Sequence, residues 1–334
     1  MRRSLLRLSI PLKEPFVTSG GVVSARELVV LRLRDEDGAE GYGEAAPLES
    51  YDGMTVERVL SALRNGESGP PQARAAEEMA RLDLDGRRSG RALGEPGADA
   101  IAVNRTLAAG PPAEVAAAAK DGVRAGYSCF KVKVGLPDDV ERVAAVREAI
   151  GPWPALRLDA NGAWSVDEAI ARIAALEPYD VQLVEQPCRT LDELAQVRPQ
   201  VGVPIAADES VTTPDDVRAA AEARACDAVN VKLAGSGGYG GAREAVREAE
   251  SQGLRAYLSS TLDGPWGIAA GLQLAASEGL SLACGLATLE LFDARIAQAL
   301  PRPRDGLLEV PQGPGLGIDV EEEALAEVVV EELE

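Results

Sequence analysis

One pattern repeats eight times between residues 101 and 287: a short apolar run rich in β-forming residues, then an alanine-rich segment of helical character. The runs are IAVNRTL, CFKVKVG, ALRLDANG, VQLVEQP, PIAADES, AVNVKLAG, RAYLSS and LACGLA. Marker residues in successive runs are 23 to 28 positions apart, the length that a strand, a crossover helix and two loops require. Near-continuous apolar strands are typical of parallel sheets covered on both faces. Eight such units predict an α/β protein with a (β/α)8-type barrel rather than an open sheet.

The N-terminal part has a different pattern. Apolar and polar residues alternate at first, and apolar residues later recur at helical spacing. The stretch ELVVLRLRDEDGAEGYGEAAPL predicts a hairpin, because Asp37-Gly38 is flanked by alternating apolar runs. Helical spacing over 55–82 is broken near NGESGPPQ, where glycine and paired prolines predict a loop. The glycine-rich stretch 86–100 is the expected domain boundary. We predict an N-terminal α+β domain over 1–97, a barrel over 98–304, and a C-terminal segment, 305–334, that returns to the first domain.

The composition argues against several classes of partner. The net charge is −20 and the pI is near 4.6, whereas nucleic acids and anionic membranes favour basic patches. Four cysteines lie far apart with no Cys-x-x-Cys pair, so neither a disulfide framework nor a thiolate zinc site is indicated. No run approaches the roughly 18 apolar residues of a membrane span, and the N-terminus has no signal-peptide core. We expect a cytoplasmic protein with a small-molecule partner.

The chain contains no histidine. This absence removes Ser-His-Asp and Cys-His catalysis, imidazole metal sites and a histidine general base. Acid–base chemistry at neutral pH would therefore fall to lysine, carboxylate, tyrosine or cysteine side chains.

Charged residues occur at the carboxyl ends of successive apolar runs, which is the face of a barrel that carries active sites. Runs two to six present Lys131 and Lys133, Asp159 with Asn161, Glu185, Asp208 with Glu209, and Lys232. A single Asp or Lys at a strand end is usually a helix cap or a solvated group. Five successive strand ends with charges around one cavity indicate a single site.

This set of residues predicts a particular chemistry. Three carboxylates from consecutive strands form the all-oxygen ligand set that Mg²⁺ prefers, with Mn²⁺ as the alternative ion. The neighbouring Lys131 and Lys133 repel each other, and we expect this repulsion to lower a lysine pKa toward the neutral, basic form. A lysine base next to a cation could remove the α-proton of a carboxylate substrate and leave a stabilised enediolate.

The sequence GSGGYGG at 235–241 matches the glycine pattern of a dinucleotide fingerprint. It lacks the first-strand βαβ setting, and RAYLSS occupies the place where a second strand would end in an acid. We expect instead that these glycines let the loop close over the mouth of the barrel and expose helix N–H groups to an anionic substrate.

The motifs KVKVG, LDANGAW, VEQP, ADES and VNVKLAGSGG together resemble those of the enolase superfamily, in its muconate lactonizing subgroup, over nearly the whole chain. The resemblance implies that Lys133 is the catalytic lysine of strand two, Lys131 its helper and Lys232 the opposing lysine. It implies Asp159, Glu185 and Asp208 as magnesium ligands. TSGGVVSARE, which contains Gly20, and GYGEAAPL resemble the loop and hairpin of a capping domain that closes over substrate. The missing histidine departs from the mandelate racemase subgroup.

Within the subgroup, LSSTLDGPWGIAAGLQLAAS and ACGLAT resemble o-succinylbenzoate synthases, lyases of menaquinone biosynthesis. By that resemblance Ser259 and Ser260 help to hold the succinyl end of the substrate, which loses hydroxide as an aromatic ring forms. Dipeptide epimerases tend to carry Asp-x-Asp at strand eight, where this chain has ACGLATLELFDAR. Muconate cycloisomerase remains open, and a metal-stabilised binding protein has no use for the lysines. The sequence leaves monomer and homo-oligomer open.

Overall fold

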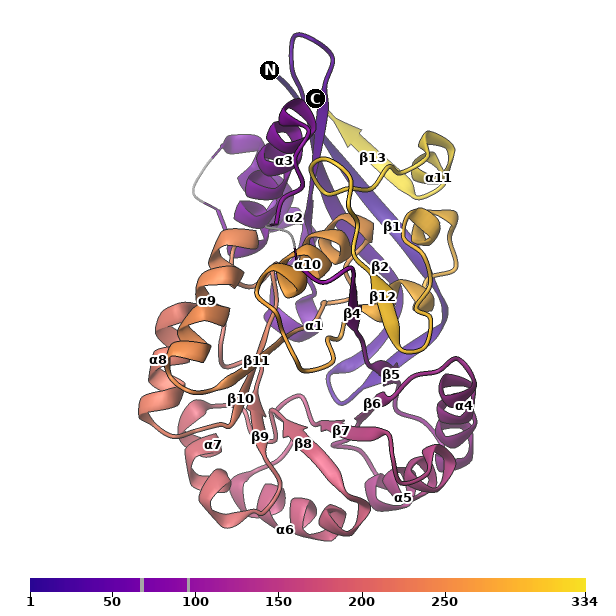
Figure 1. Cartoon of the computed structure of the whole chain (residues 1–334), viewed down its shortest axis with the longest axis vertical. Coiled ribbons are helices and arrows are strands. Elements are labelled where there is room, and N and C mark those ends of the chain that lie inside the picture. Colours follow the sequence, from indigo (N-terminus) through magenta and orange to yellow (C-terminus); the bar gives the residue numbers. More distant parts are fainter. Residues whose placement is uncertain (67–68, 95–96) are drawn as a thin grey trace.

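The computed structural model describes residues 1–66, 69–94 and 97–334. A curled sheet of seven parallel strands forms the lower part of the molecule (Figure 1). Its strands pair in chain order: β5 (Arg105–Leu107), β6 (Cys129–Lys133), β7 (Ala155–Asp159), β8 (Val181–Glu185), β9 (Ile205–Ala207), β10 (Ala228–Val231) and β11 (Arg255–Leu258). Each strand corresponds to one of the first seven runs in the sequence.

One helix follows each of these strands and lies on the outside of the sheet (Figure 1). They are α4 (Pro112–Arg124), α5 (Asp139–Ile150), α6 (Val166–Leu176), α7 (Leu191–Val197), α8 (Pro214–Glu222), α9 (Tyr239–Ser251) and α10 (Pro265–Ser277), with 3₁₀ turns η1 (Glu177–Tyr179) and η2 (Arg198–Gln200). Three of the helices, α6, α7 and α8, begin with capping boxes at Ser165, Thr190 and Thr213, in which an acid three residues later bonds back to the cap.

The eighth run closes the ring through two residues rather than through a regular strand. The N–H of Cys284 donates to the Ala102 carbonyl (2.8 Å), and the N–H of Gly285 donates to the Leu258 carbonyl (2.7 Å). These bonds join the first and last strands, so the predicted (β/α)8-type barrel is confirmed. A Cβ on Gly285 would lie 2.4 Å from the Ser259 hydroxyl oxygen, so only glycine fits there. The 3₁₀ turns η3 (Ala287–Leu291) and η4 (Arg295–Ala299) stand where an eighth helix was expected.

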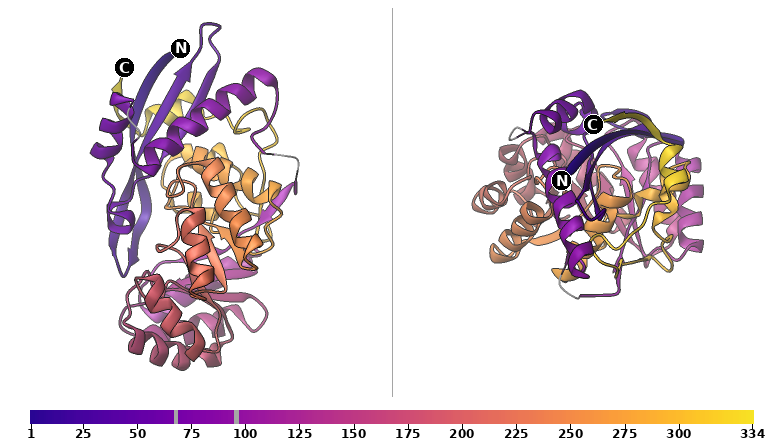
Figure 2. Two further views of the ribbon diagram at one scale, coloured as in Figure 1. Left: turned by 90° about the vertical axis from the view of Figure 1, so that its left-hand side faces the viewer. Right: turned by 90° about the horizontal axis from the view of Figure 1, so that it is seen from above.

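The N-terminal residues form an antiparallel sheet with helices on one face (Figures 1 and 2). The sheet order is β13 (Val329–Leu333), β1 (Arg2–Thr18), β2 (Gly21–Arg34) and β3 (Glu40–Ala45), and the helices are α1 (Glu49–Asp52), α2 (Val56–Asn65) and α3 (Pro71–Ser89). The hairpin predicted around Asp37-Gly38 is confirmed, with Gly38 at φ 86° in its turn. Of the loop predicted near NGESGPPQ, residues 67–68 lie outside the described residues.

The C-terminal segment contacts both parts of the molecule. After η4 the strand β12 (Leu307–Glu309) pairs with β4 (Ala100–Ala102) beside the barrel, and after α11 (Glu322–Ala326) the strand β13 pairs with β1. The expected boundary at 86–100 begins inside α3, which ends at Ser89, and its residues 95–96 lie outside the described residues. Where the chain is described, no helix is both long and apolar enough to cross a membrane.

The N-terminal sheet is buried on both faces. Leu8, Leu28 and Val30 pack in the same cluster as the barrel core, whereas Val29 and Leu31 pack against the helices of the N-terminal part. The run LVVL at 28–31 is therefore apolar without interruption because alternate side chains enter two different cores. The end of the β1–β2 hairpin and the helix α1 reach the carboxyl ends of the barrel strands; the antiparallel sheet with α1, α2 and α3 is called the capping domain below.

The glycines of GYGEA in β3 allow α3 to approach the strand closely. A Cβ on Gly43 would lie 2.0 Å from the Ala76 carbonyl oxygen, which is backbone and cannot move aside alone. We predict that Gly43→Ala lowers the free energy of unfolding by about 1–3 kcal/mol, the usual cost of overpacking. Urea unfolding monitored by circular dichroism measures this. Gly110→Ala is the control, because its Cβ would meet no atom closer than 3.6 Å; equal stability of the two variants would contradict the prediction.

Candidate active site

A cavity of about 160 Å³ lies at the carboxyl ends of the barrel strands, beneath the capping domain. Every candidate residue at the strand ends, together with Gly20, lines this cavity except Glu185, which lies under its floor with no exposed surface. The cavity-lining set comprises Gly20, Lys131, Lys133, Asp159, Asn161, Asp208, Glu209, Lys232, Ser259 and Ser260. Residues far apart in sequence therefore meet in one place.

Three buried carboxylates form the centre of the site. Asp159 and Glu185 end β7 and β8 and stand opposite each other in the parallel pairing, and Asp208 follows β9. One oxygen of each lies within 4.8 Å of the others. A buried cluster of three negative charges requires a compensating cation. The donor set is all oxygen, which fits Mg²⁺ with room for water or substrate oxygens to complete the coordination.

The three lysines contact these carboxylates. Lys131 Nζ lies 2.9 Å from Glu185 Oε1 and 2.9 Å from Asp159 Oδ2. Lys133 Nζ lies 2.6 Å from Asp159 Oδ2, and Lys232 pairs with Asp208. The two lysines of β6 thus flank one part of the cluster, and the lysine that follows β10 flanks another.

The carboxylates in contact with Lys131 determine the direction of its pKa. Burial by itself lowers the pKa of this ammonium group, but the charges of Asp159 and Glu185 oppose burial and hold the pKa above its ordinary value. Attraction by carboxylates in direct contact outweighs repulsion by a neighbouring lysine. These carboxylates therefore favour the charged form of Lys131.

Neutral side chains fix the orientation of the carboxylates. Asn230 Nδ2 donates to Glu185 Oε1 (2.9 Å), and the Tyr257 hydroxyl donates to Glu185 Oε2 (2.7 Å). Gln186 Oε1 accepts the N–H of Asp208 (2.7 Å), and Gln186 adopts a φ of 40°. Such left-handed backbone is costly for a residue with a Cβ and persists where the surroundings hold it. The orientation of the cluster is thus built into the fold.

Tyr51 is a functional residue that the sequence analysis missed. It belongs to the one-turn helix α1 of the capping domain, and its hydroxyl donates to Asp208 Oδ1 (2.9 Å) and accepts from Lys232 Nζ (2.8 Å). The Lys232 ammonium lies 4.5 Å from the centre of the Tyr51 ring, within cation–π range. Burial, followed by the charges of Asp208 and Glu209, holds the Tyr51 pKa well above its usual value, so the hydroxyl keeps its proton. A lone tyrosine in a short turn carries no periodic signal that could have revealed it.

The remaining wall of the cavity is neutral. The Ser260 and Thr288 hydroxyls lie 2.6 Å apart, and the buried Ser259 hydroxyl has no hydrogen-bond partner among the described residues. Apolar surface comes from four side chains of the capping domain and of the loop after β11: Phe16, Val23, Leu48 and Leu262. The tip of the β1–β2 hairpin is anchored to the barrel, because the Ser19 hydroxyl donates to the Ala160 carbonyl (3.1 Å).

The glycine-rich loop before α9 does not serve an anionic substrate as expected. The N–H of Gly240 donates to Glu78 Oε1 (3.1 Å), and Glu78 belongs to α3 of the capping domain. A Cβ on Gly238 would lie 1.9 Å from Glu78 Oε2, so these glycines admit a protein carboxylate. The loop is absent from the described lining of the cavity, and the N-terminus of α9 is already occupied.

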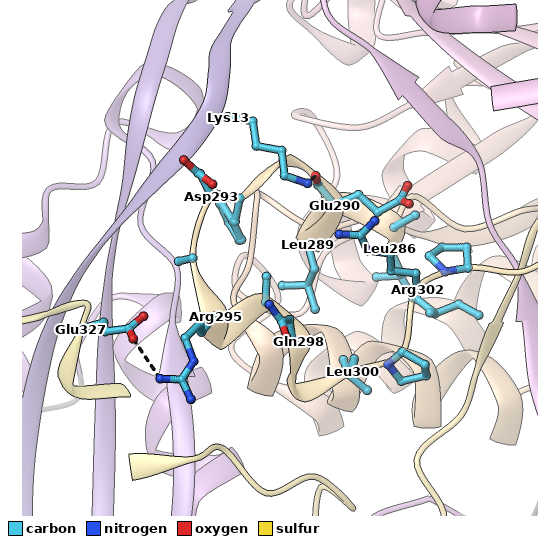
Figure 3. A pocket seen from close by; sticks show the side chains of 17 residues that line it. Lys13, Leu286, Leu289, Glu290, Asp293, Arg295, Gln298, Leu300, Arg302 and Glu327 are labelled. Carbon is cyan, nitrogen blue, oxygen red and sulfur yellow. Dashed lines mark hydrogen bonds and ion pairs between the residues drawn. The ribbon is translucent and has the colours of Figure 1, made fainter. Parts of the chain in front are cut away.

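Acidic residues that follow the eighth run face elsewhere. Glu290 and Asp293 line a separate cavity of about 550 Å³ beside η3 and η4 (Figure 3). Glu290 Oε2 accepts hydrogen bonds from Arg105 Nη1 (2.6 Å) and from the Tyr127 hydroxyl (2.6 Å). Among the described residues, the active-site cavity therefore receives carboxylates only from Asp159, Asp208 and Glu209.

A barrel with three carboxylates and opposing lysines at its strand ends defines an enzyme with metal-dependent catalysis. Comparison with known proteins agrees: a family model described as Enolase C-terminal domain-like matches residues 114–324. An o-succinylbenzoate synthase of Thermobifida fusca (strain YX) is 37% identical over 316 residues, which cover 92% of this chain and 87% of that protein. The chain belongs to the enolase superfamily, in its muconate lactonizing enzyme subgroup.

Solved structures of other subgroup members superpose closely. A muconate lactonizing enzyme from Pseudomonas fluorescens, complexed with muconolactone, has a TM-score of 0.91 at 26% identity and covers 98% of both chains. A dipeptide epimerase from Enterococcus faecalis V583, complexed with Mg and L-Leu-L-Tyr, has a TM-score of 0.87 at 27% identity and covers 95% of this chain and 99% of that one. The likeness therefore spans several reactions.

We predict that Asp208→Asn weakens binding of Mg²⁺ at least about tenfold, because even the loss of an outer-shell partner costs 10–100-fold in metal affinity. Isothermal titration with MgCl₂ measures this, with circular dichroism to verify that the fold survives. Asp215→Asn is the control, since this exposed carboxylate lies at the start of α8. Unchanged Mg²⁺ affinity in Asp208→Asn would remove Asp208 from the metal site.

Proposed function

We propose that the protein is an o-succinylbenzoate synthase-type lyase that acts on a small carboxylate substrate in menaquinone biosynthesis. The observation that carries this proposal is the division of the cavity into a charged floor and a neutral wall. The described residues of the wall offer hydroxyl groups and apolar side chains but no carboxylate for a substrate ammonium group. A substrate with a free amine would lose hydration there without gaining a partner, whereas the wall hydroxyls can donate hydrogen bonds to the keto and carboxylate oxygens of a succinyl chain.

Asp159, Glu185 and Asp208 are the residues that would hold Mg²⁺, because their oxygens converge and are buried. When bound, the ion supplies positive charge beside the substrate carboxylate and so makes the adjacent α-proton more acidic. Lys131, held as a cation by Asp159 and Glu185, contributes further positive charge from below. The floor thus favours the enediolate over the starting carboxylate.

Lys133 is the proposed base. Lys133 lines the cavity, and its Nζ is held by Asp159 Oδ2 (2.6 Å) and Asn161 Oδ1 (2.9 Å). Asn161 in turn donates to Glu209 Oε1 (2.8 Å), which fixes the orientation of the amide. After proton transfer the Lys133 ammonium can protonate the departing hydroxide, so that water leaves and the ring becomes aromatic.

Lys232 and Tyr51 occupy the other side of the cavity. The Tyr51 hydroxyl keeps the Lys232 ammonium in place through a 2.8 Å hydrogen bond. In the proposed reaction Lys232 remains a cation against the developing ring. An arrangement of lysines on two sides would also suit a two-base epimerization, and this makes dipeptide epimerase the second candidate.

The proposal predicts that the purified protein with Mg²⁺ dehydrates the synthase substrate with kcat/KM at least on the order of 10⁴ M⁻¹s⁻¹, an ordinary enzymatic value. Ultraviolet absorbance of the aromatic product measures this. The same preparation is assayed with a panel of Ala- and Glu-containing dipeptides and with muconate. A higher efficiency on any of these would assign the protein to that reaction instead.

A second prediction concerns the base. Lys133→Ala should slow turnover by about 10²–10⁴-fold, the usual contribution of a general base, and should slow deuterium exchange at the α-carbon of a non-eliminating substrate analogue. Proton NMR in D₂O follows the exchange directly. Lys120→Ala, a surface change on α4, is the control. Exchange at the wild-type rate in Lys133→Ala would show that β6 does not carry the base.

A further inference from the structure

A buried cluster of charged residues joins the capping domain to the loop after β11. Arg26 lies on β2 and Glu44 on β3, and Asp263 belongs to the loop; their exposed fractions are 2%, 1% and 5%. Arg26 Nε donates to the Thr261 carbonyl (3.0 Å), and its Nη1 donates to the Pro47 carbonyl. The guanidinium thus bridges a loop of the capping domain and a loop of the barrel.

Glu44 and Asp263 hold the same loop from two further directions. Glu44 Oε1 accepts the N–H of Gly264 (2.7 Å), and Oε2 accepts the N–H of Gly267 (3.2 Å), at the N-terminus of α10. Asp263 Oδ1 accepts the N–H of Thr261 (2.9 Å). The polypeptide from Thr261 to Gly267 is therefore held at both ends by buried charges.

The loop segment between these contacts lines the active-site cavity, and its backbone is strained. Thr261 and Leu262 line the cavity together with Ser259 and Ser260, and Leu262 adopts a left-handed φ of 59°. This conformation is unfavourable for a residue with a Cβ and persists only where the surroundings hold it. The hydrogen bonds of Arg26, Glu44 and Asp263 to the loop backbone hold this conformation in place.

Burial of these charged side chains is energetically unfavourable. Burial lowers the pKa of Arg26, and the charges of Asp263 and Glu44 oppose that shift. Burial, and after it the charge of Asp263, raises the pKa of Glu44 above its ordinary value, against the opposing N–H groups of Gly264 and Gly267. Replacing such buried charges with apolar groups often stabilises a protein. Their presence here points to a role other than stability.

We propose that Arg26, Glu44 and Asp263 are positioning residues that set the shape of the substrate-binding wall formed by Ser259, Ser260, Thr261 and Leu262. They act through the loop backbone and touch neither the lysines nor the carboxylate triad. The inference rests on the proposed function only for the choice of substrate. The capping domain would thereby control specificity through a fixed contact in addition to covering the mouth of the barrel.

Glu44→Gln tests this, because an amide can accept only one of the two N–H bonds and its NH₂ group repels the other. We expect KM for the synthase substrate to rise about tenfold with kcat within about threefold of wild type, because uniform binding is lost while the reacting groups remain. Hydrogen exchange measured by mass spectrometry should accelerate by about tenfold in a peptide spanning 259–267, as expected for loss of about one buried hydrogen bond. Exchange in β7 should not change.

Glu78→Gln is the matched control, since Glu78 also accepts an N–H at the N-terminus of a barrel helix, that of Gly240 in α9, and is absent from the described lining of the cavity. Its KM and its exchange over 259–267 should equal those of wild type. If Glu44→Gln fails to fold, Arg26→Lys replaces it, because lysine keeps the charge but cannot bridge both carbonyls. If the hydrogen-exchange rate over 259–267 in Glu44→Gln, or in Arg26→Lys, equals the rate in Glu78→Gln, the inference is wrong. Inactivity of wild type on the synthase substrate would refute only the proposed function, because the exchange measurement stands without it.

Discussion

The structure depends on the burial of three carboxylates within 4.8 Å of one another at the end of the barrel. Such a cluster cannot be desolvated alone, because each uncompensated charge costs several kcal/mol. The chain meets this requirement with three lysines from two strands and with neutral donors such as Asn230 and Tyr257. The same positive groups that make the cluster tolerable are those that the proposed proton abstraction requires, so that stability and chemistry would share one set of residues.

The capping domain completes this site rather than merely covering it. Tyr51 reaches from α1 to Lys232 and Asp208, and Ser19 ties the hairpin tip to the barrel. Glu44 and Glu78 place carboxylates on the N-termini of α10 and α9, where the helix dipoles favour negative charge. These contacts fix the orientation of the two parts. The active site is thus a product of both domains.

The barrel and the central residues could be predicted from the sequence because their signals repeat. Strand-like runs at regular spacing identified the fold, and charges at consecutive run ends identified residues that the structure brings into one cavity. The closure by Cys284 and Gly285 was predicted as a strand, but a two-residue bridge leaves the same local pattern. These features could therefore be predicted because they repeat along the sequence.

Contacts between domains could not be predicted in this way. Tyr51, Arg26 and Glu44 are single residues whose partners lie far along the chain, so no spacing marks them. The prediction that GSGGYGG binds an anionic substrate was wrong because glycine permits close approach of any anion. No pattern in the sequence indicates that the anion is the carboxylate of Glu78. The pKa of Lys131 could not be predicted from spacing alone, since it depends on how near Asp159 and Glu185 lie.

The central claim is that the carboxylate triad acts through a bound divalent ion. Solvent deuterium exchange at the α-carbon of the substrate analogue, followed by NMR with wild-type protein, tests this before any product forms. The account predicts rapid exchange with Mg²⁺, no measurable exchange in excess chelator, and recovery when Mg²⁺ is restored. Exchange at the full rate in excess chelator would contradict it.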